Sequence, residues 1–308
     1  MSVELVRRAR DGDRDAFADL VAPHRAGLLA HCYRMLGSLP DAEDAMQEAL
    51  LSAWSGLAGF EGRASVRTWL YRIVTNRCLN LLRAAGRRPG PVLWLQPYPD
   101  VMLDETPGPE ARYESREAIS LAFVTALQLL PPKQRAVLLL RDVLGFRAAE
   151  TAELLGLTEE AVTSALKRAR QRVPAGRDEV PPPVGSAAER ALVDRFVAAF
   201  TSGDVDELVA LMTDDVWVRM PPLPFEYRGV EAARQFFTSI ESHRRGVARM
   251  EPTRANGMPA WGEYARDPET GALHLTGMIV ATLAGDRIAE ITHFPDEVAL
   301  ACGLPRTP

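Results

Sequence analysis

The sequence lacks any long apolar run. No stretch approaches the roughly 18 to 20 consecutive apolar residues that a membrane-spanning helix requires. The opening segment, MSVELVRRARDGD, has no apolar region after its charged residues, which is unlike a secretory signal peptide. We therefore expect a cytoplasmic protein that makes no contact with membranes.

Cysteine is scarce, with three residues among 308. Cys32, Cys78 and Cys302 lie far apart in the sequence, and no two have the CxxC spacing. Neither a disulfide framework nor a structural zinc site is expected from this pattern. Isolated thiols of this kind behave as small apolar core residues, so the sequence predicts no metal and no other cofactor.

Charge of one sign is not abundant, because the net charge is only −5. The charges are unevenly distributed, however. From residue 186 onward 12 Arg oppose 18 Asp or Glu, which gives −6 and leaves about +1 for residues 1–185. Residues 61–88 hold seven Arg and one acid, whereas residues 39–50 hold four acids and no base. Such blocks suit a protein that touches phosphates with one face and a basic partner with another, although solvated helix faces have the same pattern.

The length and the ordinary 47% of hydrophobic residues indicate two or three globular domains. Apolar residues at spacings of three and four predict helices through residues 3–85, with a break at 37–40 and Asp41 as the N-cap of the next helix. Helices are again predicted over 113–173. Proline-rich, charged segments separate these regions, so the expected domains are 1–86 and 113–173, with an acidic linker at 87–112 and a second linker at 174–186.

Residues 187–308 are predicted to form a third domain of a different class. Two helical segments, 189–202 and 205–212, precede a strand at 216–220 and a helix at 230–240. Alternating patterns then predict strands at 260–266, 273–283 and 287–294, with a hairpin turn at 284–286. The expected fold class is therefore mainly α in the first two-thirds and α+β in the last domain, with a curved antiparallel sheet.

The strongest local motif covers residues 149–172, AETAELLGLTEEAVTSALKRARQR. A short helix at 148–155, a turn containing Gly156 and a second helix at 159–172 capped by Thr158 predict a helix-turn-helix. A helix of this kind fits the major groove of DNA. An ordinary helical hairpin with a basic face is the alternative. The exposed face of the second helix presents the candidate DNA-binding residues Thr163, Ser164, Lys167, Arg168 and Arg170.

The segment LPPKQR at 130–135, followed by this helix-turn-helix, resembles the fourth conserved region of the sigma-70 superfamily. Upstream, DAEDAMQE at 41–48 resembles that family's second region, which docks on core RNA polymerase. FEGR at 60–63 and RTWLYRIVTN at 67–76 resemble its segment that reads the minus-ten element of promoter DNA. The chain therefore resembles the extracytoplasmic-function sigma factors, which have only these two domains, and is expected to direct promoter-specific initiation rather than to act as an enzyme.

The resemblance implies two sets of site residues in the first domain. The polymerase-binding set is an acidic, Gln-containing patch at helical spacing. On its own, this pattern is also consistent with a solvated helix start. The members of the set are Asp41, Glu43, Asp44, Gln47 and Glu48. The second set combines arginines, asparagines and an aromatic side chain, a mixture that suits an opened DNA strand. Its members are Arg63, Arg67, Tyr71, Arg72, Asn76 and Asn80, whereas Trp69 and Ile73 are expected in the core.

Two further implications concern the linker and the promoter. By resemblance, the acidic linker at 87–112 is expected to thread the active-site cleft of the polymerase. Many relatives have a basic residue, then Ser or Thr, then Arg after the valine of the recognition helix, but this chain has Thr163, Ser164 and Ala165 after Val162. Its minus-thirty-five preference is therefore expected to differ from theirs.

The last domain, 187–308, resembles the SnoaL-like branch of the nuclear-transport-factor-type fold, a cone of curved sheet closed by helices. The resemblance rests on residues 195–204, 211–216, 228–229 and the closing hairpin. It implies a regulatory tail that modulates the sigma factor by intramolecular contact or by binding a small ligand. Candidate pocket residues are Trp217, Tyr227, His274 and His293, with Met220, Phe225 and Trp261 as further lining.

Two other functions remain open from the sequence alone. One is a stand-alone, ligand-responsive DNA-binding regulator, although the acidic net charge and the lack of an obvious dimerisation segment disfavour it. The other is a SnoaL-type enzyme fused to a helical module. That activity would require His274 or His293 to face a carboxylate such as Asp215 or Glu226.

Overall fold

The structure, a computed structural model, describes residues 2–86, 95–103, 119–173, 180–241 and 246–308. Its contacts form two compact units. The first contains the described residues up to 86, 102–103, 119 and 123–173, and the second contains 95–101, 120–122 and 180–308, so that α7 begins in the second unit and continues in the first. Most of the predicted first linker, part of the second and the start of the helix expected at 113 lie outside the described residues. No helix in the described ranges combines the length and the apolarity needed to cross a bilayer.

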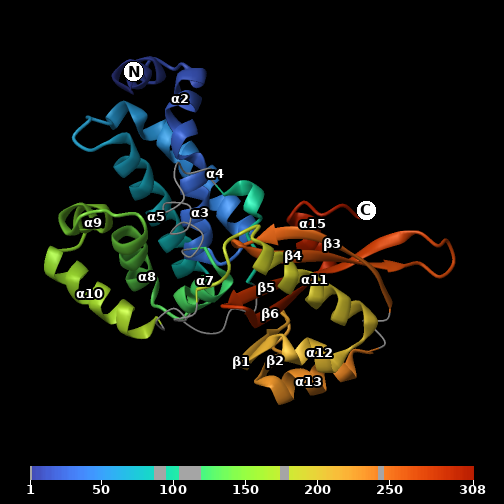
Figure 1. Cartoon of the computed structure of the whole chain (residues 1–308). Coiled ribbons are helices and arrows are strands. Elements are labelled where there is room, and N and C mark those ends of the chain that lie inside the picture. Colours follow the sequence, from blue (N-terminus) through green and yellow to red (C-terminus); the bar gives the residue numbers. More distant parts are fainter. Residues whose placement is uncertain (1, 87–94, 104–118, 174–179, 242–245) are drawn as a thin grey trace. The chain divides into compact units, whose positions relative to one another are not determined.

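The first unit is helical (Figure 1). Residues up to 86 form five helices in the order of the chain, and the segment from 121 to 172 forms four more. Single-turn helices at Ala22–His24 and Leu57–Gly59 and a π-turn at Leu139–Val143 connect them. The helices are α1 (Ser2–Arg10), α2 (Arg14–Val21), α3 (Arg25–Leu36), α4 (Leu39–Gly56), α5 (Val66–Ala84), α7 (Leu121–Gln128), α8 (Pro132–Leu138), α9 (Ala148–Leu155) and α10 (Glu159–Arg172).

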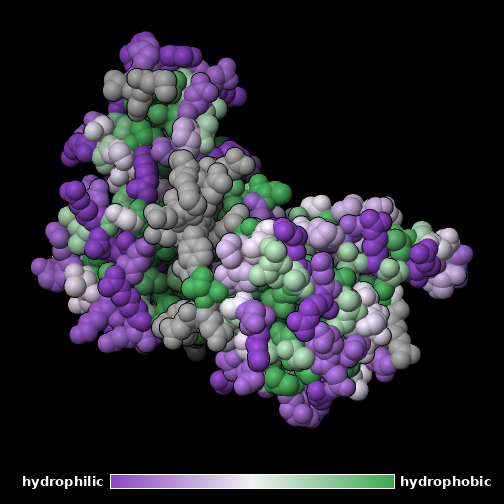
Figure 2. Space-filling view, in the orientation of Figure 1, coloured by the Kyte–Doolittle hydropathy of each residue, from purple (hydrophilic) through white to green (hydrophobic). Residues whose placement is uncertain are grey.

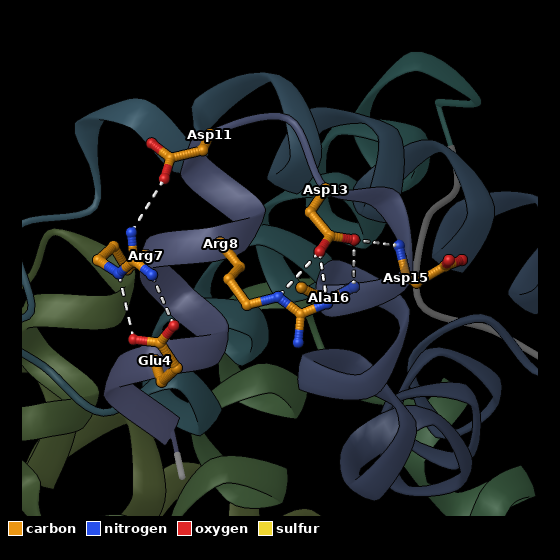
Figure 3. Close-up of polar contacts among 7 residues, drawn as sticks. All are labelled: Glu4, Arg7, Arg8, Asp11, Asp13, Asp15 and Ala16. Atoms are coloured by element: carbon orange, nitrogen blue, oxygen red, sulfur yellow. Dashed lines mark hydrogen bonds and ion pairs between the residues drawn. The ribbon is translucent and has the colours of Figure 1, made fainter.

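Side-chain caps fix where these helices begin. At the start of α2, Asp13 Oδ1 accepts hydrogen bonds from the backbone N–H groups of Asp15 and Ala16, both at 3.0 Å, while Arg8 binds Oδ2 (Figure 3). The Ala16 amide, followed by Arg8, holds the pKa of Asp13 below its ordinary value. Helix α4 starts earlier than predicted. Its N-cap is Ser38, whose hydroxyl accepts from the Asp41 N–H, so Asp41 lies inside the first turn.

Buried small and apolar side chains pack α3, α4 and α5 together. Ala42, Ala45 and Ala49 of α4 are fully buried and allow close approach of the neighbouring helices. From α5, Trp69 is buried against Phe60 at a ring separation of 5.0 Å, in agreement with its predicted place in the core. This packing leaves the polar face of each helix at the surface.

A buried histidine links α3 to α5. The Nε2 atom of His31 lies 2.9 Å from the Thr75 hydroxyl, and its ring meets Tyr71 edge-on. Burial, followed by the charge of Arg34, lowers the pKa of His31 from 6.5 to about 3. The ring is therefore neutral in the folded protein at any pH near neutrality.

This histidine makes stability depend on pH. Below pH 6.5 His31 of the unfolded chain binds a proton, whereas His31 of the folded protein stays neutral. The contribution of His31 to the free energy of unfolding is therefore full above pH 6.5 and declines as the pH falls toward 3. Between about pH 7.5 and pH 5 we expect a loss of about 2 kcal/mol in the free energy of unfolding of the first unit. Urea titrations of the wild type and of His31→Gln measure it. The substitution of exposed His274 by Gln is the control, and an equal pH dependence in all three proteins would contradict the prediction.

The predicted helix-turn-helix is confirmed at its predicted boundaries. Helix α9 ends at Leu155. The next residue, Gly156, adopts the left-handed conformation with φ 62°, and the Leu157 N–H donates to the Ala152 carbonyl. Thr158 then caps α10 by accepting from the Ala161 N–H at 3.2 Å. Val162 and Leu166 of α10 are buried, which turns the opposite face of that helix outward.

The second unit contains a six-stranded sheet with the order β2-β1-β6-β5-β4-β3 and four described helices. An antiparallel sheet was expected, and four of the strand pairs are antiparallel, whereas β1 and β6 are parallel. Strands β2 and β3 were not predicted. The elements are α11 (Ala187–Ser202), α12 (Val205–Ala210), β1 (Met212–Arg219), β2 (Glu226–Arg228), α13 (Val230–Ser239), β3 (Val247–Ala255), β4 (Met258–Arg266), β5 (Leu273–Ala284), β6 (Arg287–Pro295) and α15 (Asp296–Ala301).

One face of this sheet packs on the helices. Phe196 and Phe200 of α11 are buried, and the Phe196 ring lies 4.9 Å from that of Trp261 on β4. Ile279 of β5 and Ile291 of β6 complete the same core cluster. Because alternate residues of a strand share a face, this cluster identifies which face of each strand packs on the helices.

Candidate functional site

The predicted polymerase-binding residues lie on one exposed stretch of α4. Glu43, Asp44, Gln47 and Glu48 are exposed, and Asp41 is partly exposed at the first turn. The buried alanines on the other side of α4 hold this acidic face outward, and Glu48 forms an ion pair with Arg77 of α5. Acidic side chains near a helix start also complement the helix dipole. We refer to these five residues as the α4 acidic face.

Four of the six residues predicted to read an opened strand are exposed. Arg72, Asn76 and Asn80 follow one another at intervals of four along α5, which places them on one face of the helix. Asn80 accepts a hydrogen bond from Arg83 at 3.0 Å. Arg63, in the loop before α5, is exposed and pairs with Glu61 at 2.5 Å.

Arg67 and Tyr71 are in a different situation, because residues 144–146 of the same unit cover them. Arg67 donates a hydrogen bond to the Leu144 carbonyl at 2.8 Å, and its guanidinium lies 4.4 Å from the centre of the Phe146 ring. The Tyr71 ring lies 5.6 Å from that of Phe146 and is only 4% exposed. In this conformation neither side chain is free to contact DNA.

The predicted recognition residues of α10 are all exposed, namely Thr163, Ser164, Lys167, Arg168 and Arg170. The surface over α9 and α10 is mostly hydrophilic (Figure 2). Arg170 donates two hydrogen bonds to Asp142 at 2.7 and 2.9 Å, and this contact raises the pKa of Arg170. Of the three predicted cations of α10, Lys167 and Arg168 are therefore the two that Asp142 does not engage.

A contact that the sequence analysis missed lies in the second unit, where residues 95–101 pack on the turn between β3 and β4. Tyr98 N–H donates to Asn256 Oδ1 at 2.7 Å, and Asn256 N–H donates to the Tyr98 carbonyl at 2.8 Å. Asp100 Oδ1 accepts from Gly257 N–H at 2.7 Å, and Pro99 forms an isolated β-bridge with Ala255. Tyr98 and Asn256 are fully buried. The only local signal in the sequence was the Asn-Gly pair of this turn. Such a pair predicts a hairpin turn, but it does not predict that residues 95–101 pack on that turn.

The four predicted pocket residues are not brought together. Trp217 lies on the face of β1 opposite the core residues Val216 and Val218, with Arg219 4.4 Å from its ring centre. Tyr227 packs on Phe236, and His274 is exposed.

His293 shares the core-facing side of β6 with Ile291 and pairs with Glu263 of β4 at 2.8 Å. Glu263 is fully buried, and Gly277 of the strand between them leaves room for the pair, since a Cβ there would lie 2.6 Å from His293 Nε2. The candidate partner Glu226 instead contacts Arg219 at 3.3 Å.

The second unit also has a hollow of about 510 Å³ between the first turns of α11, the end of the β3–β4 pair and residues 95–101, which we call the docked segment. Its lining is mainly apolar, with two arginines and two carboxylates. We refer to it as the α11 hollow. Its lining residues are Asp100, Val101, Glu189, Arg190, Val193, Pro252, Thr253, Arg254, Pro259, Ala260 and Trp261.

Comparison with known proteins accounts for this arrangement of domains. Family models match three segments: "Sigma-70 region 2" at residues 20–88, "Sigma-70, region 4" at 120–173 and "SnoaL-like domain" at 193–291. The "ECF RNA polymerase sigma factor SigG" of Mycobacterium tuberculosis is 40% identical over 325 aligned residues, covering 97% of this chain and 86% of SigG. The chain belongs to the ECF RNA polymerase sigma factors.

Two other relatives agree with this assignment. The ECF sigma factor SigM of M. tuberculosis is 36% identical over 170 residues, which cover 55% of this chain and 81% of SigM. The crystal structure of M. tuberculosis SigJ matches with a TM-score of 0.64 at 23% identity, covering 90% of this chain and 96% of that chain. The SigJ match shows that the fold is shared.

As an ECF sigma factor, the chain binds core RNA polymerase and directs it to promoter DNA. Sigma factors as a family are not enzymes. The family does not by itself assign a residue of this chain to either partner, and the sets described above remain predictions for those contacts.

Proposed function

We propose that the SnoaL-like domain regulates this alternative sigma factor by holding the segment between its two helical sigma domains. The proposal keeps the divisions expected from the sequence: a region 2-like domain at 1–86, a linker at 87–112, a region 4-like domain at 113–173, a second linker at 174–186 and the SnoaL-like domain at 187–308. It places the chain in the cytoplasm, where core polymerase works, and it includes no catalytic step.

The observation that carries the proposal is the reciprocal pair of hydrogen bonds between Tyr98 and Asn256. The resemblance places the linker along the active-site cleft of the polymerase. A linker segment whose Tyr98 is buried on the SnoaL-like domain is not available for that cleft at the same time. The two positions of the linker therefore compete, and the SnoaL-like domain disfavours the polymerase-bound one.

The covered side chains of α5 support the same proposal. Arg67 and Tyr71 are occupied by Leu144 and Phe146, so capture of an opened strand requires residues 144–146 to leave α5. We propose that core polymerase, bound through the α4 acidic face, stabilises the separated arrangement. Arg63, Arg72, Asn76 and Asn80 then hold the minus-ten strand together with Arg67 and Tyr71, while α10 reads the minus-thirty-five element.

The regulatory role is tested by run-off transcription with purified core polymerase. Asn256→Ala removes the acceptor for Tyr98 N–H, which normally contributes about 1 to 2 kcal/mol, so we expect an increase in initiation of about 5-fold or more. Deletion of residues after 185 is expected to produce a similar or larger increase.

The matched control is Glu269→Ala, an exposed position in the turn between β4 and β5, at the other end of β4 from Asn256, which should leave initiation unchanged. Unchanged initiation in both Asn256→Ala and the truncated chain would remove the regulatory proposal. Failure of every form to start synthesis with core polymerase would contradict the sigma-factor activity itself and would favour a stand-alone DNA-binding regulator. A gel shift with and without core polymerase separates these two functions.

A further inference from the structure

We propose that the α11 hollow binds a small amphipathic carboxylate whose acid group competes with Asp100 of the linker for Arg254. The proposal rests on the proposed function for its regulatory meaning only, because binding to the hollow is measurable without polymerase. A ligand at this place would touch both the SnoaL-like domain and the segment that this domain holds.

The apolar part of the hollow suits a short chain or ring. Val193 of α11 lines the hollow together with Pro252 of β3 and with Pro259 and Trp261 of β4. The volume of about 510 Å³ is within the range of roughly 300 to 1,000 Å³ that small-ligand sites span. Val101 of the linker is 91% exposed and adds little to the wall, so the apolar contacts of a ligand come from α11, β3 and β4.

Arg254 supplies the polar end of the hollow. Its Nη1 donates to Glu189 at 3.1 Å and its Nη2 to the Gly257 carbonyl at 2.9 Å. Its Nε is buried and makes no hydrogen bond within the described residues, with Asp100 Oδ2 at an ion-pair distance of 3.4 Å. A buried N–H without an acceptor is costly, and an oxygen of an incoming acid would satisfy it.

The charges around the hollow decide which contact breaks when the acid binds. Arg254 and Arg190 balance Asp100 and Glu189, so an added carboxylate creates an excess of negative charge. Glu189 and Asp100 each accept a backbone N–H, from Gly185 at 2.6 Å and from Gly257 at 2.7 Å, but the backbone of Glu189 is fixed within α11, so Glu189 stays in place. Asp100 belongs to the linker and is the carboxylate that can leave. Binding of the acid therefore weakens the docked linker, which is the direction of activation.

The test uses decanoate as the probe and 1-decanol as its neutral counterpart, with the full-length protein and isothermal titration calorimetry. We expect decanoate to bind in a one-to-one ratio. It should bind at least about tenfold more tightly than decanol, because decanol cannot accept the charge-assisted hydrogen bond as a carboxylate does. Hydrogen–deuterium exchange should become faster at residues 98–101 and 255–258 when decanoate is present, because the Gly257 N–H loses its bond to Asp100.

Two variants locate the site. Arg254→Gln removes the cation and Val193→Trp fills the apolar part, and each is expected to weaken decanoate binding at least about tenfold. The matched controls are Arg228→Gln and Leu223→Trp, at positions outside the hollow, which should bind as the wild type does. If Arg254→Gln misfolds by circular dichroism, Val193→Trp decides alone.

Absence of decanoate binding, unweakened binding by both site variants, or equal binding of decanol would overturn the proposal. Binding without faster exchange at 98–101 would overturn its coupling to the linker. Each of these results is independent of run-off transcription, so failure of the ligand site is distinguishable from failure of the proposed regulation.

Discussion

Replacing Lys167 and Arg168 together with alanine is expected to lower initiation from the promoters of this sigma factor about 30-fold, because groove contacts are worth about 1 kcal/mol or more each. Both side chains are exposed on α10, and neither is engaged as Arg170 is by Asp142. Binding to core polymerase should be unchanged, because the α4 acidic face is untouched. Run-off transcription and a pull-down of core polymerase measure the two properties separately.

The salt dependence of promoter binding distinguishes a groove contact from a general charge effect. If both cations meet phosphates, the slope of log affinity against log salt concentration should fall by about 1.8. The control is the double substitution of Arg195 and Arg234 by alanine, which removes the same charge from the SnoaL-like domain, where these side chains pair with Glu207 and Asp206. Equal losses in the two double variants would mean that net charge, and not α10, governs promoter binding.

The boundaries of α9 and α10 could be predicted because every signal for them is local. Gly156 supplies the left-handed residue, Thr158 supplies the cap, and Val162 and Leu166 supply the apolar spacing. The α4 acidic face was predictable for the same reason, since a regular helix converts spacing directly into a shared face. Ser38 displaced Asp41 as the cap because both are good capping residues, and the proline at position 40 fits the first turn of a helix.

Strand β3 could not be predicted from its own residues. It contains Pro252 and has no clear alternation of apolar and polar side chains. It is the last strand of the sheet, where one side of the backbone needs no partner and proline is tolerated. What makes it a strand is β4, which pairs with it from Val247 to Ala255 and lies later in the sequence.

The same limit applies to the sites. Tyr71 was placed on the DNA face because of the resemblance and the mixture of arginine, asparagine and aromatic residues around it. Its burial depends on Phe146, which lies 75 positions later in the sequence. His293 meets Glu263 only because β5 lies between their strands and offers Gly277 at that level. Docking of Tyr98 on Asn256 joins residues 158 positions apart. Contacts of this range depend on the packing of whole elements, which a one-dimensional pattern does not encode.

Arg135→Ala is expected to destabilise the first unit by about 3 to 5 kcal/mol, because it leaves several buried acceptors without a donor. Arg135 is 4% exposed and donates to the Met35 carbonyl, to Gln128 Oε1, and to the carbonyls of Gln128 and Leu130 at 3.1 and 3.3 Å. Met35 lies in the last turn of α3, where the helix dipole favours a cation. The arginine of the LPPKQR motif thus joins α8 to the end of α3.

Urea unfolding, followed by the circular dichroism of the helices, measures this effect. The control is Lys133→Ala on the same helix. Because Lys133 is exposed, this substitution should change the free energy of unfolding by less than about 0.5 kcal/mol. Gln128→Ala, which removes the donor to the Arg34 carbonyl at 3.1 Å and one acceptor of Arg135, should show an intermediate loss. The double variant Gln128→Ala and Arg135→Ala should lose less than the two single losses combined, because the two side chains act as one unit. Strict additivity, or a loss for Arg135→Ala no larger than that for Lys133→Ala, would mean that the two helical domains are held together by other contacts.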